Sequence, residues 1–190
     1  MMARTHDLAA ITAYGYVVLT QPVRMVTVTT ALIAVVANQI GGIAPDIDQP
    51  TAPFWRNLPV GGYLGKLIDK MLGGHRFITH SLIGLAIFGL GFMALLNLFH
   101  PIMPAVDIHI VWWAFIIGMI SHLIMDTFTK EGVPWLLPIP FKFGLPPIKS
   151  LRVTTGKWVE KSIFVGLLAV DLWYCSSHYT QLVNVFHHIR

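Results

Sequence analysis

Apolar residues dominate four long stretches of the chain, which cover residues 26–44, 80–99, 110–128 and 161–178. Each stretch is close to the roughly twenty apolar residues that an α-helix needs to cross a bilayer. A fifth apolar stretch, residues 8–20, is shorter and is followed by Pro22, which ends a helix. The pattern predicts an all-α, polytopic membrane helix bundle with four transmembrane helices and a short N-terminal helix. It leaves open whether residues 3–20 cross the membrane.

The segments that connect these stretches differ in their content of basic residues. The 45–79 loop carries four Lys or Arg residues and the 129–160 loop carries five, whereas the 100–109 loop has none. Because cytoplasmic loops of membrane proteins are enriched in Lys and Arg, we expect both basic loops on the cytoplasmic side. The prolines of the 129–160 loop, in PWLLPIPFKFGLPP, are incompatible with regular helix and predict an irregular lid or interfacial loop.

The composition supports this class of protein. Of the 190 residues, 55% are hydrophobic and only 12% are charged, and the mean hydropathy is +0.66. Soluble domains contain about 25% charged residues, so we expect an integral membrane protein with a single domain over residues 1–190. The net charge of +4 fits the basic cytoplasmic loops. There is no basic patch interleaved with aromatic residues, so we predict membrane lipids as partners and no nucleic acid.

Ionisable residues gather at those ends of the apolar stretches that this topology places on the cytoplasmic side. They are His6, Asp46, Asp48, His75, His80, His122, Asp126 and Glu160. Hydrocarbon cannot solvate such side chains, so they are expected to pair, to bind an ion or to take part in chemistry. The count of basic residues and the placement of these side chains are separate arguments. Their agreement predicts a metal centre at one surface of the bilayer.

The clearest local motif is Ser121-His122-x-x-x-Asp126, near the end of the third long stretch. Residues four apart share one face of a helix, so both side chains can bind one ion, as histidines at this spacing bind zinc. The alternative is a His–Asp hydrogen bond that ties two helices together. The motif by itself does not decide between the two.

Two further motifs lie between the first long stretch and the start of the second. Asp46 and Asp48 follow a helix end in a turn, where both carboxylates can approach a cation, although a solvated turn is the alternative. His75 and His80 lie five residues apart across a helix start, which Thr79 or Ser81 can cap. Arg76, between them, is a planar, bidentate donor suited to phosphate or carboxylate. The simpler alternative has these three residues as interfacial side chains.

Asp171 and Cys175 lie inside the fourth long stretch. Asp171 is expected either to face the bundle and pair with a polar residue, or to mark a helix that is not fully embedded. Cys175 is the only cysteine, so it forms no internal disulfide and is expected to be a small packing residue.

Three ordered motifs together resemble a known family. They are APDID at 44–48, HRxxTHS at 75–81 and SHxxxDxxTxxG at 121–132. They resemble the YdjM-like family, which is described as LexA-regulated, membrane-bound, metal-dependent hydrolases. The resemblance implies a bacterial inner-membrane protein that is multi-pass and hydrolytic. By motif match it implies the metal-site positions His6, Asp46, Asp48, His75, His80, His122 and Asp126.

We therefore predict a metal-dependent hydrolase with its site at the cytoplasmic membrane interface. Water activated by a divalent ion, with Zn, Mn and Fe fitting equally well, would attack a phosphoryl or acyl centre. Arg76 would hold the substrate anion, and Asp48 or Glu160 would act as general base. A site at this depth suits an amphiphilic or phosphorylated substrate. The alternative is a non-catalytic membrane protein with a structural metal site; a transporter is disfavoured because the helix centres carry no path of polar residues.

Overall fold

The computed structural model describes the whole chain except residues 22–25, 74–75, 140, 181–182 and 184–190. Its long helices are α1 (Ala3–Thr20), α2 (Val28–Ile43), α5 (Leu82–Phe99), α6 (Ile108–Thr127) and α7 (Trp158–Ser177). Shorter helices are η1 (Ala44–Asp48), α3 (Pro53–Arg56), α4 (Gly61–Met71), η2 (His100–Ile102) and η3 (Lys149–Leu151). The described residues contain no β-strand and only two isolated bridges. The predicted all-α class is confirmed.

Helix α6 lies at the centre of the bundle and packs against α1, α2 and α5. Its residues Val111, Ala114 and Met119 are fully buried and form the core together with Ala34 of α2. The α5 helix joins this core through aromatic packing, because the ring of Phe92 stacks on Phe115 of α6 at 4.2 Å between centroids. This packing fixes α6 as the helix on which the other elements are arranged.

Helices α2 and α6 approach each other so closely that glycine is required at the contact. A Cβ atom on Gly118 would lie 2.1 Å from the carbonyl oxygen of Asn38, and one on Gly41 would lie 2.1 Å from that of Phe115. Small residues allow helices to approach closely where no hydrophobic effect drives them together in lipid. The Asn38 side chain strengthens the contact by donating a hydrogen bond to the Ala114 carbonyl at 3.0 Å.

Local sequence signals define where the helices begin. The hydroxyl oxygens of Thr27 and Ser81 accept hydrogen bonds from the backbone N–H groups of Thr30 and Gly84, at the starts of α2 and α5. The Asp107 carboxylate does the same for α6. Side-chain caps of this kind satisfy backbone donors that have no partner inside the helix. Of the two predicted caps for α5, the structure uses Ser81.

Three helical segments are long and apolar enough to cross a membrane: Val28–Asp48, Leu82–Ile102 and Ile108–Thr127. The predicted fourth span corresponds to α7, which is helical but is not among them, so the four-span count is not confirmed. The reason lies in its composition, because Glu160, Lys161 and Asp171 interrupt its apolar sequence. Asp171 faces the neighbouring helix, where its carboxylate accepts a hydrogen bond from Thr12 of α1 at 3.1 Å.

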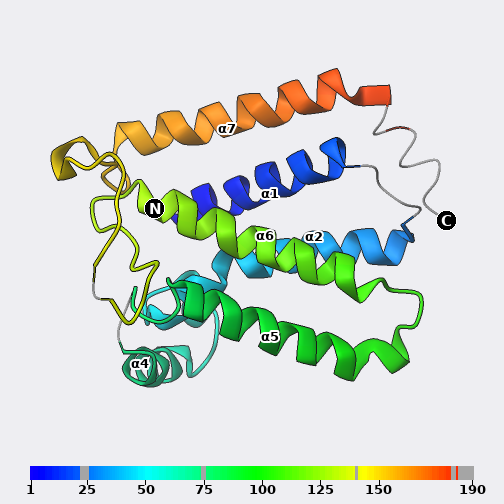
Figure 1. The fold of residues 1–190 in the computed structure, drawn as a ribbon, viewed down its shortest axis with the longest axis horizontal. Helices are drawn as coiled ribbons and strands as arrows, with labels where there is room; N and C mark the ends of the chain where they lie inside the picture. The colour runs from blue at the N-terminus through cyan, green and yellow to red at the C-terminus, as the bar shows by residue number, and fades with distance from the viewer. Residues whose placement is uncertain (22–25, 74–75, 140, 181–182, 184–190) are drawn as a thin grey trace.

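The five long helices run side by side, and Figure 1 shows that the ends carrying the predicted site residues meet at one end of the bundle. The start of α1, the end of α2 and the end of α6 lie there together with the start of α5. Helix α4 is seen almost end-on in this view, so it lies across the bundle. The irregular segment between α6 and α7 covers the same end, and its described residues contain no helix except η3.

Candidate metal centre

Histidine and carboxylate side chains from α1, η1, α6 and the turn before α5 converge at this end of the bundle. They form two overlapping triads, His6–His122–Asp126 and Asp46–His80–His122, and within each triad the potential ligand atoms lie within 4.8 Å of one another. His122 belongs to both. All of these side chains are buried except Asp46, whose side chain is 21% exposed. Residues that are up to 120 positions apart in the sequence therefore form one compact polar cluster.

The Asp126 carboxylate is the centre of the cluster. The Nε2 atoms of His6, His80 and His122 lie 3.2, 3.5 and 3.7 Å from its oxygens. Its Oδ2 atom also lies 2.6 Å from a guanidinium nitrogen of Arg76. The α-amino group of Met1 lies 2.8 Å from Oδ1. One buried carboxylate thus faces three imidazoles and two cationic groups.

Two of the imidazoles are oriented by the ring nitrogen that faces away from the cluster. The Nδ1 atom of His122 lies 2.6 Å from the Gly42 carbonyl oxygen, which can only accept, so Nδ1 carries the proton. His80 Nδ1 lies 2.9 Å from the Thr79 hydroxyl, which itself donates to Asp48. Because the Thr79 hydroxyl donates its proton to Asp48, it can only accept from His80, so His80 Nδ1 carries a proton and donates it to Thr79. With Nδ1 as the donor in both rings, Nε2 is the atom through which each neutral imidazole would bind a metal, as in metal-ligating histidines.

The donor set fits a divalent metal ion. The Nε2 atom of His122 is buried and has no hydrogen-bond partner among the described residues, although it lies 3.6 Å from Asp46 Oδ1. A buried polar atom without a partner is costly, and a metal ion would satisfy it. Burial by itself would lower the pKa of His80, but the carboxylates of Asp126 and Asp48 outweigh burial and raise it. The same negative field favours a bound cation.

Arg76 is buried in the cluster and is not an exposed basic anchor. Its guanidinium group contacts Asp126, donates to the Thr129 hydroxyl at 2.8 Å and lies 3.5 Å from the exposed carboxylate of Glu131. Its backbone N–H donates to Asp48 Oδ2 at 3.0 Å. The φ angle of 59° places Arg76 in the left-handed region, which non-glycine residues rarely adopt. Such a conformation costs about 1–3 kcal/mol and occurs often at functional sites.

Glu160 was predicted as a possible general base, and the structure places it in a different setting. Its carboxylate accepts hydrogen bonds from the backbone N–H groups of Met2 at 2.5 Å and Gly156 at 2.6 Å. The side chain is buried and joins the start of α7 to the start of α1. It belongs to neither triad. Its contacts are those of an anchor between segments.

The remaining predicted residues divide into two cases. Asp48 is fully buried, and it contacts Arg76, Thr79 and His80. It therefore lies on the Nδ1 side of His80, away from the cluster, and is not a member of the two triads. His75 lies outside the described residues.

Three residues that shape the site had no predicted role in it: Gly42, Thr79 and Thr129. Gly42 contributes only its carbonyl oxygen, which leaves no signal in a sequence. Thr79 was expected at most to cap a helix, yet it relays a hydrogen bond from His80 to Asp48. Thr129 lies in the SHxxxDxxTxxG motif, so its position in that motif was the available signal.

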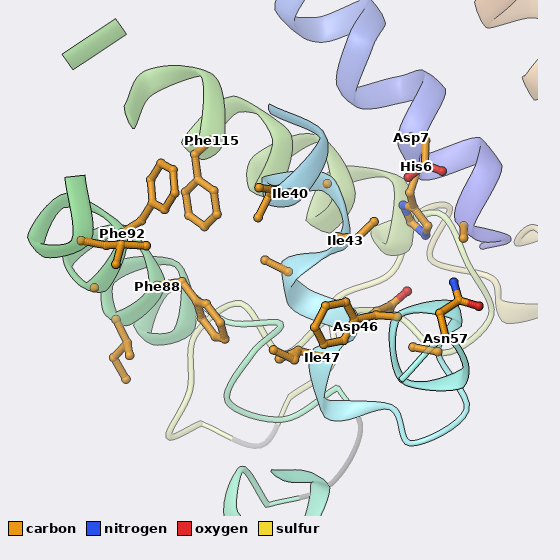
Figure 2. Close-up of a pocket in the computed structure, with 18 residues that line it drawn as sticks. His6, Asp7, Ile40, Ile43, Asp46, Ile47, Asn57, Phe88, Phe92 and Phe115 are labelled. Atoms are coloured by element: carbon orange, nitrogen blue, oxygen red, sulfur yellow. The ribbon is translucent and has the colours of Figure 1, made fainter. Parts of the chain in front are cut away.

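A mainly apolar pocket of about 730 Å³ opens beside the cluster (Figure 2). His6, Asp7 and Asp46 form its polar side, and the rings of Phe88, Phe92 and Phe115 line the other. Asp7 directly follows His6, and no role was predicted for it. Burial raises the pKa of Asp7 above its usual value, an effect that the nearby His6 partly offsets. The buried polar cluster thus borders a cavity of the size that small-molecule sites occupy.

Comparison with known proteins agrees with the membrane setting of the site. The family described as "YdjM inner membrane protein" matches residues 1–184, so the chain belongs to this family. It is 31% identical over 134 residues to the inner membrane protein YdjM of Escherichia coli K12, covering 69% of this chain and 61% of that protein. The YdjM protein of Shigella flexneri matches to the same extent. The predicted family resemblance is confirmed, and the protein is a membrane protein.

A second relative covers more of the chain. The uncharacterized protein YvsG of Bacillus subtilis 168 is 28% identical over 177 residues, which are 92% of this chain and 94% of that protein. The chain spans about six-tenths of the length of the two enteric relatives. No solved structure matches it.

Proposed function

We propose that this protein is a membrane-bound, metal-dependent hydrolase that acts on phosphoesters at the cytoplasmic face of the bacterial inner membrane. One observation carries the proposal: the Nε2 atoms of three buried histidines lie within 3.7 Å of the buried carboxylate of Asp126. Mixed imidazole and carboxylate groups of this kind hold Zn, Mn or Fe in proteins. Membership of an inner-membrane family and three apolar spans support the location.

His6, His80, His122 and Asp126 would hold the metal, with Asp46 completing the set. A divalent ion bound there would polarise a substrate oxygen and lower the pKa of a coordinated water towards about 7. These five donor groups exceed the four ligands that a closed structural zinc site uses. The surplus, together with the pocket beside the cluster, favours a site that is open to substrate or holds two ions.

The chain's own groups have separate roles in this proposal. Asp46 is the partly exposed carboxylate on the pocket wall; with one oxygen towards the metal, its other oxygen would accept a proton from the attacking water. Arg76 carries a fixed positive charge beside Asp126, where it would stabilise the negative charge that develops on a phosphoryl group. Asp48 acts through His80, which it orients by way of Thr79. It is a positioning residue in this mechanism.

The test is the metal content of detergent-purified protein, measured by elemental analysis in the wild type and in His122→Ala. We expect one to two equivalents of a transition metal in the wild type and a loss of at least tenfold in the variant. His109→Ala is the matched control, because His109 lies on the same helix at its opposite end, and it should keep the metal. Wild-type protein without metal after reloading with Zn or Mn would overturn the proposal.

Activity is tested on the loaded protein with a chromogenic phosphodiester and with phosphomonoesters. We expect hydrolysis that is abolished by chelation and reduced at least a hundredfold in Asp46→Asn. A structural ion gives a different result: chelation would lower the unfolding temperature strongly while no ester substrate is turned over. That outcome would support a metal site with a structural role and would contradict the proposed hydrolase activity.

A further inference from the structure

The pocket beside the metal cluster extends from α1, η1 and α3 along three apolar helices of the bundle. Its apolar wall includes Ile40 and Ile43 of α2, Phe92 and Leu95 of α5, and Phe115 of α6. These three helices are the segments that are long and apolar enough to cross a bilayer. The cavity therefore runs from the polar cluster towards the hydrocarbon core, where a water-soluble ligand would not be placed.

The two ends of the pocket differ in chemistry, as Figure 2 shows. His6 and Asp46 lie at one end and are also members of the metal cluster. The phenyl rings of Phe92 and Phe115 lie at the other end. On α5 the lining residues run from Ile87 to Leu95, eight positions that correspond to about 12 Å of helix. A long apolar slot that ends at a polar, charged site is complementary to an amphiphile.

We propose that this pocket binds one hydrocarbon chain of a membrane phospholipid-like phosphoester, whose phosphate then lies at the metal cluster. The position of the phosphate rests on the function proposed above, whereas the binding of the chain does not. The chain would enter from the lipid phase, lie between α2 and α5, and hold the ester bond beside Asp46. The site would thereby favour substrates with a long hydrocarbon chain in the slot over water-soluble phosphoesters.

Gly91 offers a way to fill the pocket without disturbing the fold. It lines the cavity on α5, and a Cβ atom placed on it would meet no heavy atom within 4 Å. Gly91→Phe would therefore place a ring in the slot without a backbone clash. Gly166→Phe is the matched control, because Gly166 lies on α7, has equally open surroundings and does not line the pocket.

The experiment uses lysophosphatidic acid that carries a photoactivatable diazirine in its single acyl chain, added to the full-length protein in detergent. In the wild type we expect crosslinks on α5 between residues 87 and 95 and on α2 near Ile40, and unlabelled lysophosphatidic acid should suppress them. Glycerol phosphate, which has the head group without the chain, should not compete. Gly91→Phe should reduce crosslinking at least tenfold, and Gly166→Phe should change it less than twofold.

Crosslinks spread over the exposed face of α7, or equal labelling in both glycine variants, would overturn the proposal. The crosslink map of the wild type depends on no variant, so a misfolded Gly91→Phe protein would still leave a decisive result. The same measurement on His122→Ala separates the two proposals. Pocket labelling that persists in protein without metal supports the chain site even if the hydrolase proposal fails. Turnover of short-chain phosphoesters without pocket labelling supports the hydrolase alone.

Discussion

At the scale of single residues, the cluster combines contacts that a sequence reveals with contacts that it hides. His122 and Asp126 are four apart, which predicts a shared helix face, and their side chains lie 3.7 Å apart. The hydrogen bond from His122 to the Gly42 carbonyl joins residues 80 positions apart. It could not be predicted, because a backbone carbonyl has the same chemistry at every residue. The same holds for the relay from His80 through Thr79 to Asp48.

Glu160 gives a residue-scale prediction that is independent of the metal. Burial by itself would raise the pKa of Glu160, but hydrogen bonds from the backbone N–H groups of Gly156 and Met2 outweigh burial and lower it. Its ionised form therefore stabilises the folded state. Glu160→Gln should lower the free energy of unfolding at pH 7 by about 1–2 kcal/mol, since hydrogen bonds to charged groups are stronger than neutral ones.

The stabilisation by ionised Glu160 should depend on pH in a defined direction. Because the pKa is lower in the folded state, the stabilisation is present above the unfolded value of about 4.3 and is lost as the pH falls through the folded value. The difference in unfolding temperature between wild type and Glu160→Gln should therefore shrink in acid. Glu131→Gln is the control, since that carboxylate is 65% exposed, and it should behave like the wild type. A difference that grows on acidification would contradict the anchoring role.

At the scale of the helices, hydropathy predicted where the elements lie better than how they pack. Apolar stretches at 26–44, 80–99 and 110–128 correspond closely to α2, α5 and α6. The 161–178 stretch corresponds to α7, whose three charged residues, Glu160, Lys161 and Asp171, leave it outside the apolar spans. The contact of α2 with α6 could not be predicted in the same way, because a glycine in a membrane helix does not by itself mark a helix contact. Only the structure shows that Gly41 and Gly118 are at the contact.

The glycine contact leads to a prediction for stability. Gly118→Ala would place a Cβ atom 2.1 Å from a backbone oxygen of α2, so the helices must separate. Overpacking of this kind costs about 1–3 kcal/mol, and we expect a lower unfolding temperature in detergent. Gly166→Ala, where a Cβ meets nothing within 4 Å, should be neutral or slightly stabilising because alanine favours helix. Equal effects of the two substitutions would show that the contact is looser than described.

The separation of α2 and α6 in Gly118→Ala should also disturb the geometry of the metal cluster. Gly118 packs against the α2 backbone next to Gly42, whose carbonyl orients His122. We therefore expect Gly118→Ala to bind metal more weakly than the wild type, measured by chelator competition, although none of its atoms is a ligand. Unchanged metal affinity in a destabilised variant would separate the packing of α2 and α6 from the geometry of the site.

At the scale of the whole molecule, the polar groups, the basic loops and the crosswise helix α4 share one end of the bundle (Figure 1). Helix α4 exposes Tyr63, Leu67 and Met71 and carries Lys66 and Lys70. An amphipathic helix with basic residues that lies across the spans is typical of a membrane interface. The same orientation follows from the absence of Lys and Arg in the 100–109 loop at the opposite end.

This orientation can be measured because the chain has a single cysteine. In a Cys175→Ser background, Ala105→Cys reports on the loop between α5 and α6, and Lys149→Cys reports on the segment before α7; both positions are exposed. Basic segments are retained on the cytoplasmic side, so a membrane-impermeant maleimide should label Ala105→Cys in intact cells whose outer membrane has been permeabilised. It should reach Lys149→Cys only after the inner membrane is opened. The reverse pattern would place the metal centre on the outer face and would require a substrate supplied from outside the cytoplasm.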